Sequence, residues 1–301
     1  MKLAYIVLAH KNPAQVARLI QSLDNNYATI FLHIDQNADA SEFKTICARR
    51  DNIVAVKSVK TPRGGFGLVE ATINGIKAVM DDKRTFDFVS LISGQHYPIK
   101  SNEQIRDYLN STTRSAFIEY TSLPDYDRWE PRGGLYRIDR YFLGLETHQR
   151  FMAKTLNFLL QKANIFKRIF PENLKPFGGS QWWTLNNDSL QYIMRFIKNN
   201  EEFITFHKYS FAPDELFFHN ILLNATDDKI KSGITNNNLL YMNWPDTGKG
   251  HPEILRSSDF ANILTSDLLF ARKFDTEQDA AILDLIDDNV RFERATKQGA
   301  F

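Results

Sequence analysis

The chain has 301 residues, of which 43% are hydrophobic and 24% charged, values typical of a globular protein with a sizeable core. Its formal net charge of +1 gives no reason to expect a nucleic acid as partner, and its single cysteine, Cys47, excludes an intrachain disulfide and a cysteine metal cluster. No repeat, low-complexity tract or linker divides the chain, so one large α/β domain is expected rather than two small ones.

The N-terminal decapeptide MKLAYIVLAH carries a short apolar run that is ended by His10, Lys11 and Asn12. The run is too short for a signal peptide or a membrane span, and it predicts a buried strand at 3–9. No other stretch approaches the length of a span. We therefore expect a cytoplasmic protein that is at most peripheral to a membrane.

Apolar runs of strand length alternate with helical patterns through the first third of the chain. This order is typical of an α/β fold with a parallel sheet and right-handed crossovers, in which ligands bind at the carboxyl ends of the strands. Strands are predicted at 3–9, 29–34, 53–56 and 86–92, and helices at 13–23, 41–50 and 67–80.

Polar residues follow the predicted strands, where a ligand would bind. Asp35 comes directly after the second strand, and a carboxylate there can accept hydrogen bonds from a ribose or a base edge; a turn cap is the alternative. Arg63, Gly64 and Gly65 precede a helix, where glycines let backbone N–H groups approach a phosphate or a base; an ordinary left-handed turn is the alternative. The chain has neither the dinucleotide fingerprint after the first strand nor a P-loop.

The second half is less regular. It predicts a loop region with some strand at 120–140, an amphipathic helix at 151–170, a Gly-rich turn entering a strand at 176–185, a helix at 187–199, a strand at 236–244, and helices at 257–266 and 277–288.

The segment YSFAPDELFFH, residues 209–219, combines an aromatic run, Pro213 and an acidic pair. Proline suits the first turn of a helix, which places Glu215 in that turn beside Leu216 and Phe217. A carboxylate held against an apolar surface loses solvation and becomes a better proton acceptor. An acid that merely complements the helix dipole is the alternative.

Two cations, Arg272 and Lys273, are bracketed by apolar residues in LLFARKFD, residues 268–275. Held in this way they could stabilise a diphosphate leaving group without a metal; the basic end of a helix is the alternative. The sequence shows no spacing of residues that is typical of a metal site, since the seven histidines are scattered. The pair Asp125 and Asp127 lies in a Pro-containing loop, which indicates a solvated turn. The Gly-x-Ser-x-Gly elbow of serine hydrolases is also missing.

The motifs, taken in order, resemble the core 2/I-branching β-1,6-N-acetylglucosaminyltransferases and the peptide O-xylosyltransferases, which form glycosyltransferase family 14. Each motif is modest alone, but the ordered set is specific and spans nearly the whole chain. The short form without an anchor looks like the bacterial members. The stretches are YIVLAH (5–10), FLHID (31–35), GGFGLVEA (64–71), LISGQHYPIK (91–100), GGSQW (178–182), APDE (212–215) and FARKF (270–274).

The resemblance implies a GT-A-like, Rossmann-type mixed sheet flanked by helices. It implies one glycosyltransferase domain with a nucleotide-binding half, 1–115, and an acceptor-binding and catalytic half, 116–301. The implied reaction is inverting transfer of a sugar, N-acetylglucosamine or xylose, from a UDP-sugar to a glycan or lipid-linked glycan, without a metal or other cofactor. For a bacterial member, any peripheral membrane contact would be with the inner membrane.

The resemblance also assigns roles by position. Glu215 matches the general base, and Arg272 and Lys273 match the diphosphate-binding pair. The remaining matches are Asp35 with a nucleoside-binding acid, Val7 and Ala9 with the strand at the uracil, Arg63-Gly64-Gly65 with a Trp-Gly-Gly stretch of the nucleotide pocket, Gln181-Trp182 with an Asp-Trp pair near donor sugar and acceptor, and His251 with a further phosphate contact.

Three residues depart from the family pattern. His96 and Gln181 stand where aspartates are usual, and Arg63 replaces an aromatic residue. The first two departures bear on substrate identity more than on mechanism. A non-catalytic nucleotide-sugar or glycan-binding protein on the same fold is the alternative function. A nucleotidyltransferase is disfavoured because the acidic metal site that it needs is missing from the sequence.

Overall fold

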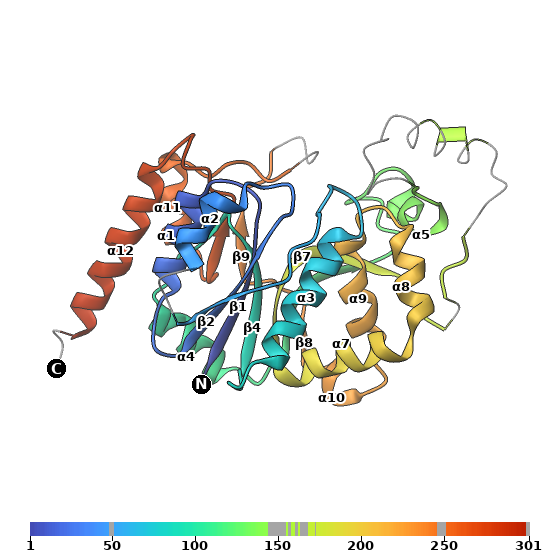
Figure 1. The fold of residues 1–301 in the computed structure, drawn as a ribbon, viewed down its shortest axis with the longest axis horizontal. Coiled ribbons are helices and arrows are strands. Elements are labelled where there is room, and N and C mark those ends of the chain that lie inside the picture. Colours follow the sequence, from blue (N-terminus) through green and yellow to red (C-terminus); the bar gives the residue numbers. More distant parts are fainter. Residues whose placement is uncertain are drawn as a thin grey trace.

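The computed structural model describes residues 1–47, 51–143, 168–171, 173–245 and 251–298, together with Thr155, Phe158, Leu159 and Lys162. These residues form a central sheet with helices on both of its faces (Figure 1). The predicted mixed α/β sheet flanked by helices, of the GT-A-like Rossmann type, is confirmed.

The described strands form two sheets. The strands are β1 Leu3–Ala9, β2 Ala28–Ile34, β3 Ile53–Ala55, β4 Phe88–Ser93, β5 His96–Pro98, β6 Ala116–Ser122, β7 Phe177–Asn186, β8 Ile234–Thr235, β9 Leu240–Met242 and β10 Phe270–Arg272. The larger sheet has the order β3-β2-β1-β4-β7-β6-β8 and the smaller one β5-β10-β9. The first four strands of the larger sheet are parallel, as expected, whereas β7 is antiparallel to both of its neighbours.

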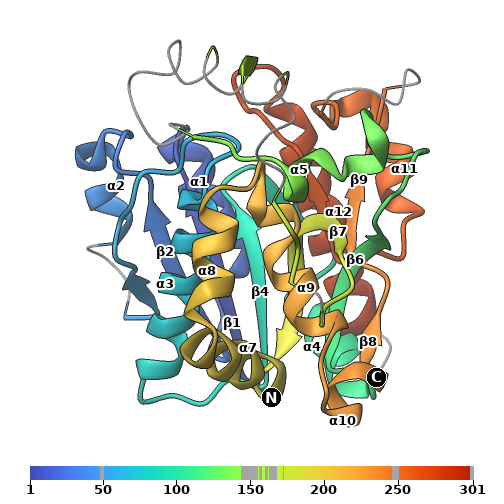
Figure 2. The same cartoon turned by 90° about the vertical axis from the view of Figure 1, so that its right-hand side faces the viewer.

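Helices cover the larger sheet on both sides. They are α1 Pro13–Leu23, α2 Ala40–Cys47, α3 Gly67–Asp81, α4 Asn102–Ser111, α5 Tyr136–Asp139, α7 Asn187–Asn199, α8 Glu201–Lys208, α9 Phe217–Leu223, α10 Asp228–Ser232, α11 Phe260–Leu264 and α12 Ala281–Gln298, with 3-10 turns η1 Arg132–Gly134, η2 Pro213–Glu215 and η3 Ser257–Asp259. Figures 1 and 2 place α3, α7, α8 and α9 on one side and α1, α11 and α12 on the other. None of the described helices is both long and apolar enough to cross a membrane.

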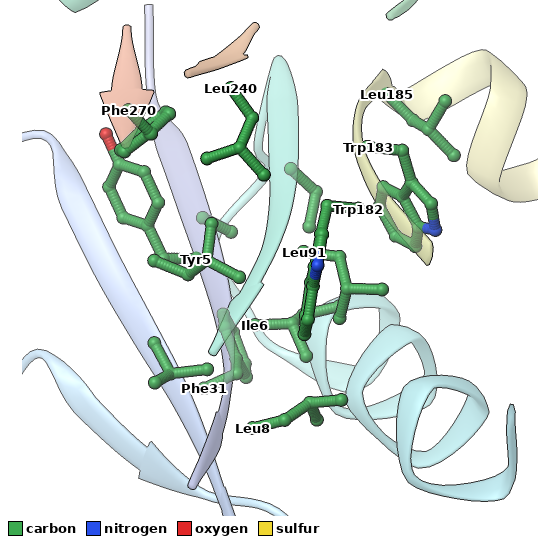
Figure 3. Close-up of a cluster of buried hydrophobic side chains, with 14 of the residues drawn as sticks. Tyr5, Ile6, Leu8, Phe31, Leu91, Trp182, Trp183, Leu185, Leu240 and Phe270 are labelled. Carbon is green, nitrogen blue, oxygen red and sulfur yellow. The ribbon is translucent and has the colours of Figure 1, made fainter. Parts of the chain in front are cut away.

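Strand β1 lies at the centre of the core. All seven of its residues are buried, as expected for a parallel strand covered on both faces. Gly75 of α3 allows the close packing, because a Cβ there would lie 2.5 Å from Cγ2 of Ile6. On the other face Tyr5 meets Phe270 edge to face at 6.1 Å and so joins the two sheets (Figure 3).

The elements predicted for the first third are confirmed to within one or two residues, and the helix predicted at 41–50 is described as far as Cys47. The helix predicted at 151–170 lies largely outside the described residues. The predicted helix at 277–288 begins at Ala281, and that at 257–266 is split into η3 and α11. Arg272 lies at the end of strand β10, so the alternative of a helix end is wrong.

The carboxyl ends of β1, β2 and β4 meet at one edge of the sheet. The register pairs Ala9 with Ile34, and the N–H of Asp35 donates to the carbonyl of Ala9 at 2.9 Å. The N–H of Gly94, after β4, donates to the carbonyl of Leu8 at 3.0 Å. The polar residues that follow these three strands are therefore neighbours in space, as their positions in the sequence predicted.

Candidate active site

Three basic side chains converge near the carboxyl edge of the sheet. Arg272 ends β10, Lys273 follows it, and Arg63 lies in the turn before α3. Burial lowers the pKa of Lys273, and the nearby charges of Arg272, Lys11 and Arg63 lower it further. In the described part of the chain no carboxylate pairs with Arg63, Arg272 or Lys273. These three side chains, called the cation group below, form an uncompensated positive charge that suits an anion.

Arg272 has aromatic and apolar surroundings. Its guanidinium lies 4.8 Å from the centre of the Trp182 ring, a cation–π contact, and its buried Nε has no hydrogen-bond partner among the described residues. Burial lowers the pKa of Arg272 to about 10, and the charge of Glu215 acts in the opposite direction. A poorly solvated cation of this kind is stabilised when an anion binds beside it.

His96 lies opposite Arg272 in the smaller sheet and is 1% exposed. The N–H of Ser93 donates to its Nδ1 at 3.0 Å, so the ring proton is on Nε2. Its ring packs edge-on against Trp182 at 4.6 Å. Burial, and then the charge of Arg272, lower the pKa of His96 well below its usual value. A neutral group therefore stands beside Arg272, where the family usually carries an aspartate.

His251 joins this region from the loop that follows β9. Its Nε2 accepts a hydrogen bond from the guanidinium of Arg63. Burial lowers the pKa of His251, and the charges of Arg63, Lys273 and Arg272 lower it further. The position that the resemblance matched with a phosphate contact thus lies next to the cation group.

Glu215 is paired with Arg137, a partner 78 positions earlier in the chain. Its side chain is 36% exposed, whereas that of Arg137 is 9% exposed. The charge of Glu215 also acts on Arg272 and His251. The carboxylate therefore lies in the same region of the structure as the cation group.

The guanidinium of Arg137 is fixed by aromatic stacking as well as by Glu215. It lies 4.4 Å from the centre of the Trp129 ring. The indole in turn rests on Gly178 and Gly134, where a Cβ would lie 2.4 Å and 2.7 Å from its carbon atoms. Only glycine leaves room for the ring at these two places, so the glycines help to set the position of the cation that holds Glu215.

One hydrogen bond links the turn at Gly64 to the segment that carries Glu215. The N–H of Ala212 donates to the carbonyl of Gly64 at 2.9 Å, and the N–H of Glu215 donates to the carbonyl of Ala212 at 3.2 Å. Both turns need left-handed backbone, with φ of +79° at Gly64 and 46° at Ala212. This conformation is strained for alanine and is held by its surroundings.

The acidic pair is arranged differently from the sequence expectation. Pro213 begins a 3-10 turn rather than an α-helix, and α9 starts only at Phe217. The acid that is buried is Asp214, which is 7% exposed. Burial raises its pKa to about 7, with a further contribution from the charge of Glu215. Glu215 itself is more exposed and pairs with Arg137, so the burial expected for Glu215 falls on its neighbour Asp214.

Three residues that were predicted to contact the nucleotide, Asp35, Val7 and Ala9, lie in or directly after strands of the larger sheet and not in the cation group. The carboxylate of Asp35 accepts hydrogen bonds from the N–H groups of Asn37 and Thr61, at 2.6 Å and 2.8 Å, and from the hydroxyl of Thr61. These are the contacts of a turn cap, and they fix the chain that leads to Arg63. Val7 and Ala9 are fully buried in β1.

The Gln181-Trp182 pair lies on β7, and alternate residues of a strand face opposite sides. Trp182 faces His96 and Arg272, whereas Gln181 is half-buried and its Nε2 has no partner among the described residues. Trp183 belongs to the core (Figure 3). Its ring centre lies 5.9 Å from that of Phe218.

Sequence reasoning assigned no role to three residues of this arrangement, namely Lys11, Trp129 and Arg137. Lys11 is one of the polar residues that follow β1, which ends at Ala9. Trp129 and Arg137 lie in irregular structure, where no periodic pattern places them. Within the described residues, His, Cys, Asp and Glu side chains form no group of three that could hold a metal ion.

Residues 3–269 match the family model of the Core-2/I-Branching enzyme. The chain belongs to this family. Among curated relatives of this Core-2/I-Branching protein, xylosyltransferase 2 of Rattus norvegicus is 22% identical over 95% of this chain and 33% of its own length. Beta-glucuronosyltransferase GlcAT14B of Arabidopsis thaliana is 25% identical over 97% of this chain and 66% of its own length. The chain thus spans about a third of the xylosyltransferase.

Two solved structures are also similar. The apo form of mouse xyloside xylosyltransferase 1 has a TM-score of 0.34 and 11% identity, with 90% of this chain and 96% of that one covered. The 4-diphosphocytidyl-2C-methyl-D-erythritol synthase of Anaerococcus prevotii has a TM-score of 0.35 and 15% identity, with 77% and 94% covered. Both TM-scores are too low for an inference about function.

Proposed function

We propose that the protein is an inverting, metal-independent glycosyltransferase that moves a sugar from a UDP-sugar to a hydroxyl of a glycan. The observation that carries this proposal is the cation group, whose three basic side chains lack carboxylate partners in the described structure and lie near Glu215. Family membership supports the same reading.

On the leaving-group side, Arg272 and Lys273 would bind the diphosphate of UDP, and Arg63 and His251 would add contacts at its edge. Negative charge develops on the diphosphate oxygen as the glycosidic bond breaks. Positive groups that are already in place stabilise that charge without reorganisation. This is the role often supplied by a divalent ion, which is why we propose that none is needed.

On the acceptor side, Glu215 would act as general base. The acceptor oxygen attacks the anomeric carbon from the face opposite UDP, the bond from that carbon to the diphosphate breaks, and the acceptor proton passes to the Glu215 carboxylate. Gln181 stands where the family has an aspartate, but an amide cannot take up the proton. Glu215 matches the family's general base by position and its carboxylate is 36% exposed, so we assign the role of base to it.

The proposed acceptor is a glycan or lipid-linked glycan, reached from the cytoplasm with at most a peripheral contact to the inner membrane. Half-buried aromatic rings surround Arg137 beside Glu215, with Trp129 at 4.4 Å and Tyr136 and Phe211 both at 5.9 Å. Aromatic faces of this kind offer stacking surface to a sugar ring. The donor sugar is proposed to be N-acetylglucosamine or xylose, and glucuronic acid is included because one relative is named a glucuronosyltransferase.

The test is UDP release from these three UDP-sugars in the presence of EDTA and candidate glycan acceptors, with the native protein and Glu215→Gln. We expect turnover of one donor that persists in EDTA and falls roughly 10²–10⁴-fold in the variant, the range for loss of a general base. Turnover that EDTA abolishes and Mn²⁺ restores would refute metal independence. Tight UDP binding with equal, negligible turnover in both proteins would instead favour a binding protein.

A further inference from the structure

The segment that carries the diphosphate-binding pair is tied down just beyond the end of its strand. The ladder of β10 with β5 and β9 stops at Arg272. From Phe274 to Thr276 the chain is held by side chains of the β1–α1 region, which come from the opposite end of the sequence, and by Gln95, whose carbonyl accepts the N–H of Phe274 at 2.9 Å. The position of Lys273 therefore depends on contacts that no strand pairing supplies.

Gln15 makes two of these contacts and a third hydrogen bond to Gly94, and it is 1% exposed. Its Nε2 donates to the carbonyl of Gly94 at 2.9 Å and to that of Phe274 at 3.1 Å. Its Oε1 accepts the N–H of Thr276 at 2.9 Å. A buried amide with all of these bonds made fixes three chain segments relative to one another, and losing any partner would leave a costly unpaired group.

Asp275 is the second anchor and is 5% exposed. Its carboxylate accepts Nζ of Lys11 at 2.7 Å and Nδ2 of Asn12 at 3.0 Å, and it also accepts the N–H of Glu277 at 3.2 Å. Burial alone would raise the pKa of Asp275, but the hydrogen bonds from Lys11, Glu277 and Asn12 hold it below its usual range. The carboxylate is thus charged and fully engaged.

The cation group needs such anchors because its members repel one another. The charges of Arg272 and Arg63, together with that of the neighbouring Lys11, all lower the pKa of Lys273. Before an anion arrives, their mutual repulsion favours a wider spacing. Asp275 offsets the charge of Lys11 directly, and Gln15 holds the backbone on both sides of Asp275.

We propose that Gln15 and Asp275 are positioning residues that pre-organise Arg272 and Lys273 for a diphosphate. The inference rests on the proposed function of that pair. Neither residue is offered as a contact of the nucleotide: both hold the backbone that carries the cations, and the charge of Asp275 also acts on Lys273. Binding to a site that is already ordered loses less free energy to ordering, so the anchors should raise the affinity for the diphosphate in particular.

The experiment compares Asp275→Asn, Asn12→Gly and the double variant with the native protein. Asn12 has a φ of 52°, which glycine adopts readily, and its side chain makes no cap to α1, so this change removes the bond to Asp275 with little other effect. The matched control is Asp279→Asn. Asp279 accepts N–H groups of Ser257 and Ile282 in the same loop region and does not reach the β1–α1 residues.

UDP affinity would be measured by calorimetry and uridine affinity by ligand-observed NMR. We expect the Kd for UDP to rise about tenfold in Asp275→Asn and about threefold in Asn12→Gly, with no further loss from Asn12→Gly once Asp275 is changed. Uridine binding and the Asp279→Asn control should be unchanged. The expected loss of affinity thus concerns only the diphosphate part of UDP. A general loosening of the fold would weaken the binding of uridine as well.

The outcomes separate this inference from the function on which it rests. UDP binding that is native-like in a folded Asp275→Asn variant would overturn the positioning role. Equal losses for UDP and uridine would also overturn it, because they indicate general damage. If Asp275→Asn does not fold, the UDP-to-uridine ratio in Asn12→Gly decides alone. A native protein that binds no UDP contradicts the proposed function instead.

Discussion

The two sides of the candidate site treat charge in opposite ways. On the donor side, the cation group has no carboxylate partner among the described residues. On the acceptor side, Glu215 is already paired with Arg137, which is itself stacked on Trp129. The difference indicates that the positive charge of the donor side is neutralised when its anionic ligand binds. On the acceptor side the charges are already paired in the free protein. Changes on the two sides should therefore have opposite consequences for stability and binding.

The largest expected effect is on the donor side. Arg272→Met should weaken UDP binding about a hundredfold, because a buried charge-assisted contact to the diphosphate is lost. The free protein should be no less stable, since an unpaired buried cation is replaced by an apolar side chain of similar length. Calorimetry gives the first quantity and thermal unfolding the second.

The matched control for this change is Arg106→Met. Arg106 is also an arginine stacked on an aromatic ring, at 4.9 Å from the centre of Tyr27, and it pairs with Asp107 away from the site. The control should bind UDP normally. A clear drop in the melting temperature of Arg272→Met would show that Arg272 is already neutralised, and the contrast between the two sides would fail.

The next effect is on the acceptor side. Arg137→Met should lower the free energy of unfolding by about 1–3 kcal/mol, because Glu215 loses its partner and Trp129 its stacked cation. The Kd for UDP should not change, while kcat should fall about tenfold as the base loses its fixed orientation. Urea unfolding and steady-state kinetics measure the two effects.

Arg128→Met is the control on that side, since Arg128 stacks on the same indole at 5.3 Å but pairs with Glu119. Arg128→Met should lower the free energy of unfolding by no more than about 1 kcal/mol, because exposed ion pairs contribute little to stability. Its kcat should stay near the native value. Equal kinetic losses in both variants would indicate that the indole matters and that the Arg137–Glu215 pair does not.

The smallest effect concerns Asp214, whose pKa is raised to about 7 in the folded protein by burial and by Glu215. The unfolded chain ionises this group near pH 4, so the folded state binds the extra proton between about pH 4 and 7. Its contribution to stability is therefore complete below pH 4 and is lost as the pH rises through 7. Asp214→Asn should flatten this part of the profile and stabilise the protein at pH 8 by on the order of 1 kcal/mol.

Urea unfolding of the native protein and Asp214→Asn from pH 4 to 8 checks this sign. Parallel profiles for the two proteins would mean that Asp214 is not the group that titrates. Because Asp214 belongs to the same short turn as Glu215, the variant should also be assayed for UDP binding, which we expect to be unchanged.

The strands and helices of the first third could be predicted from the sequence because alternating strands and helices have strong periodic signals. The helix α4 was overlooked although its start is marked by a capping box between Ser101 and Gln104. The predicted cations and Glu215 come together in space. Arg137 could not be foreseen in the same way, because its partner is 78 positions away and lies across irregular loops. The burial of Asp214 rather than Glu215 depends on a 3-10 turn that local pattern does not distinguish from a helix.

The stacking of Arg272 on Trp182 gives the protein an optical reporter of its own ligand. The indole is 6% exposed and lies between a neutral imidazole and a buried cation. An anion that neutralises Arg272 changes the electric field across the ring, and indole emission is sensitive to such a field. Intrinsic fluorescence should therefore follow occupancy of the donor site in real time, without a label and without turnover.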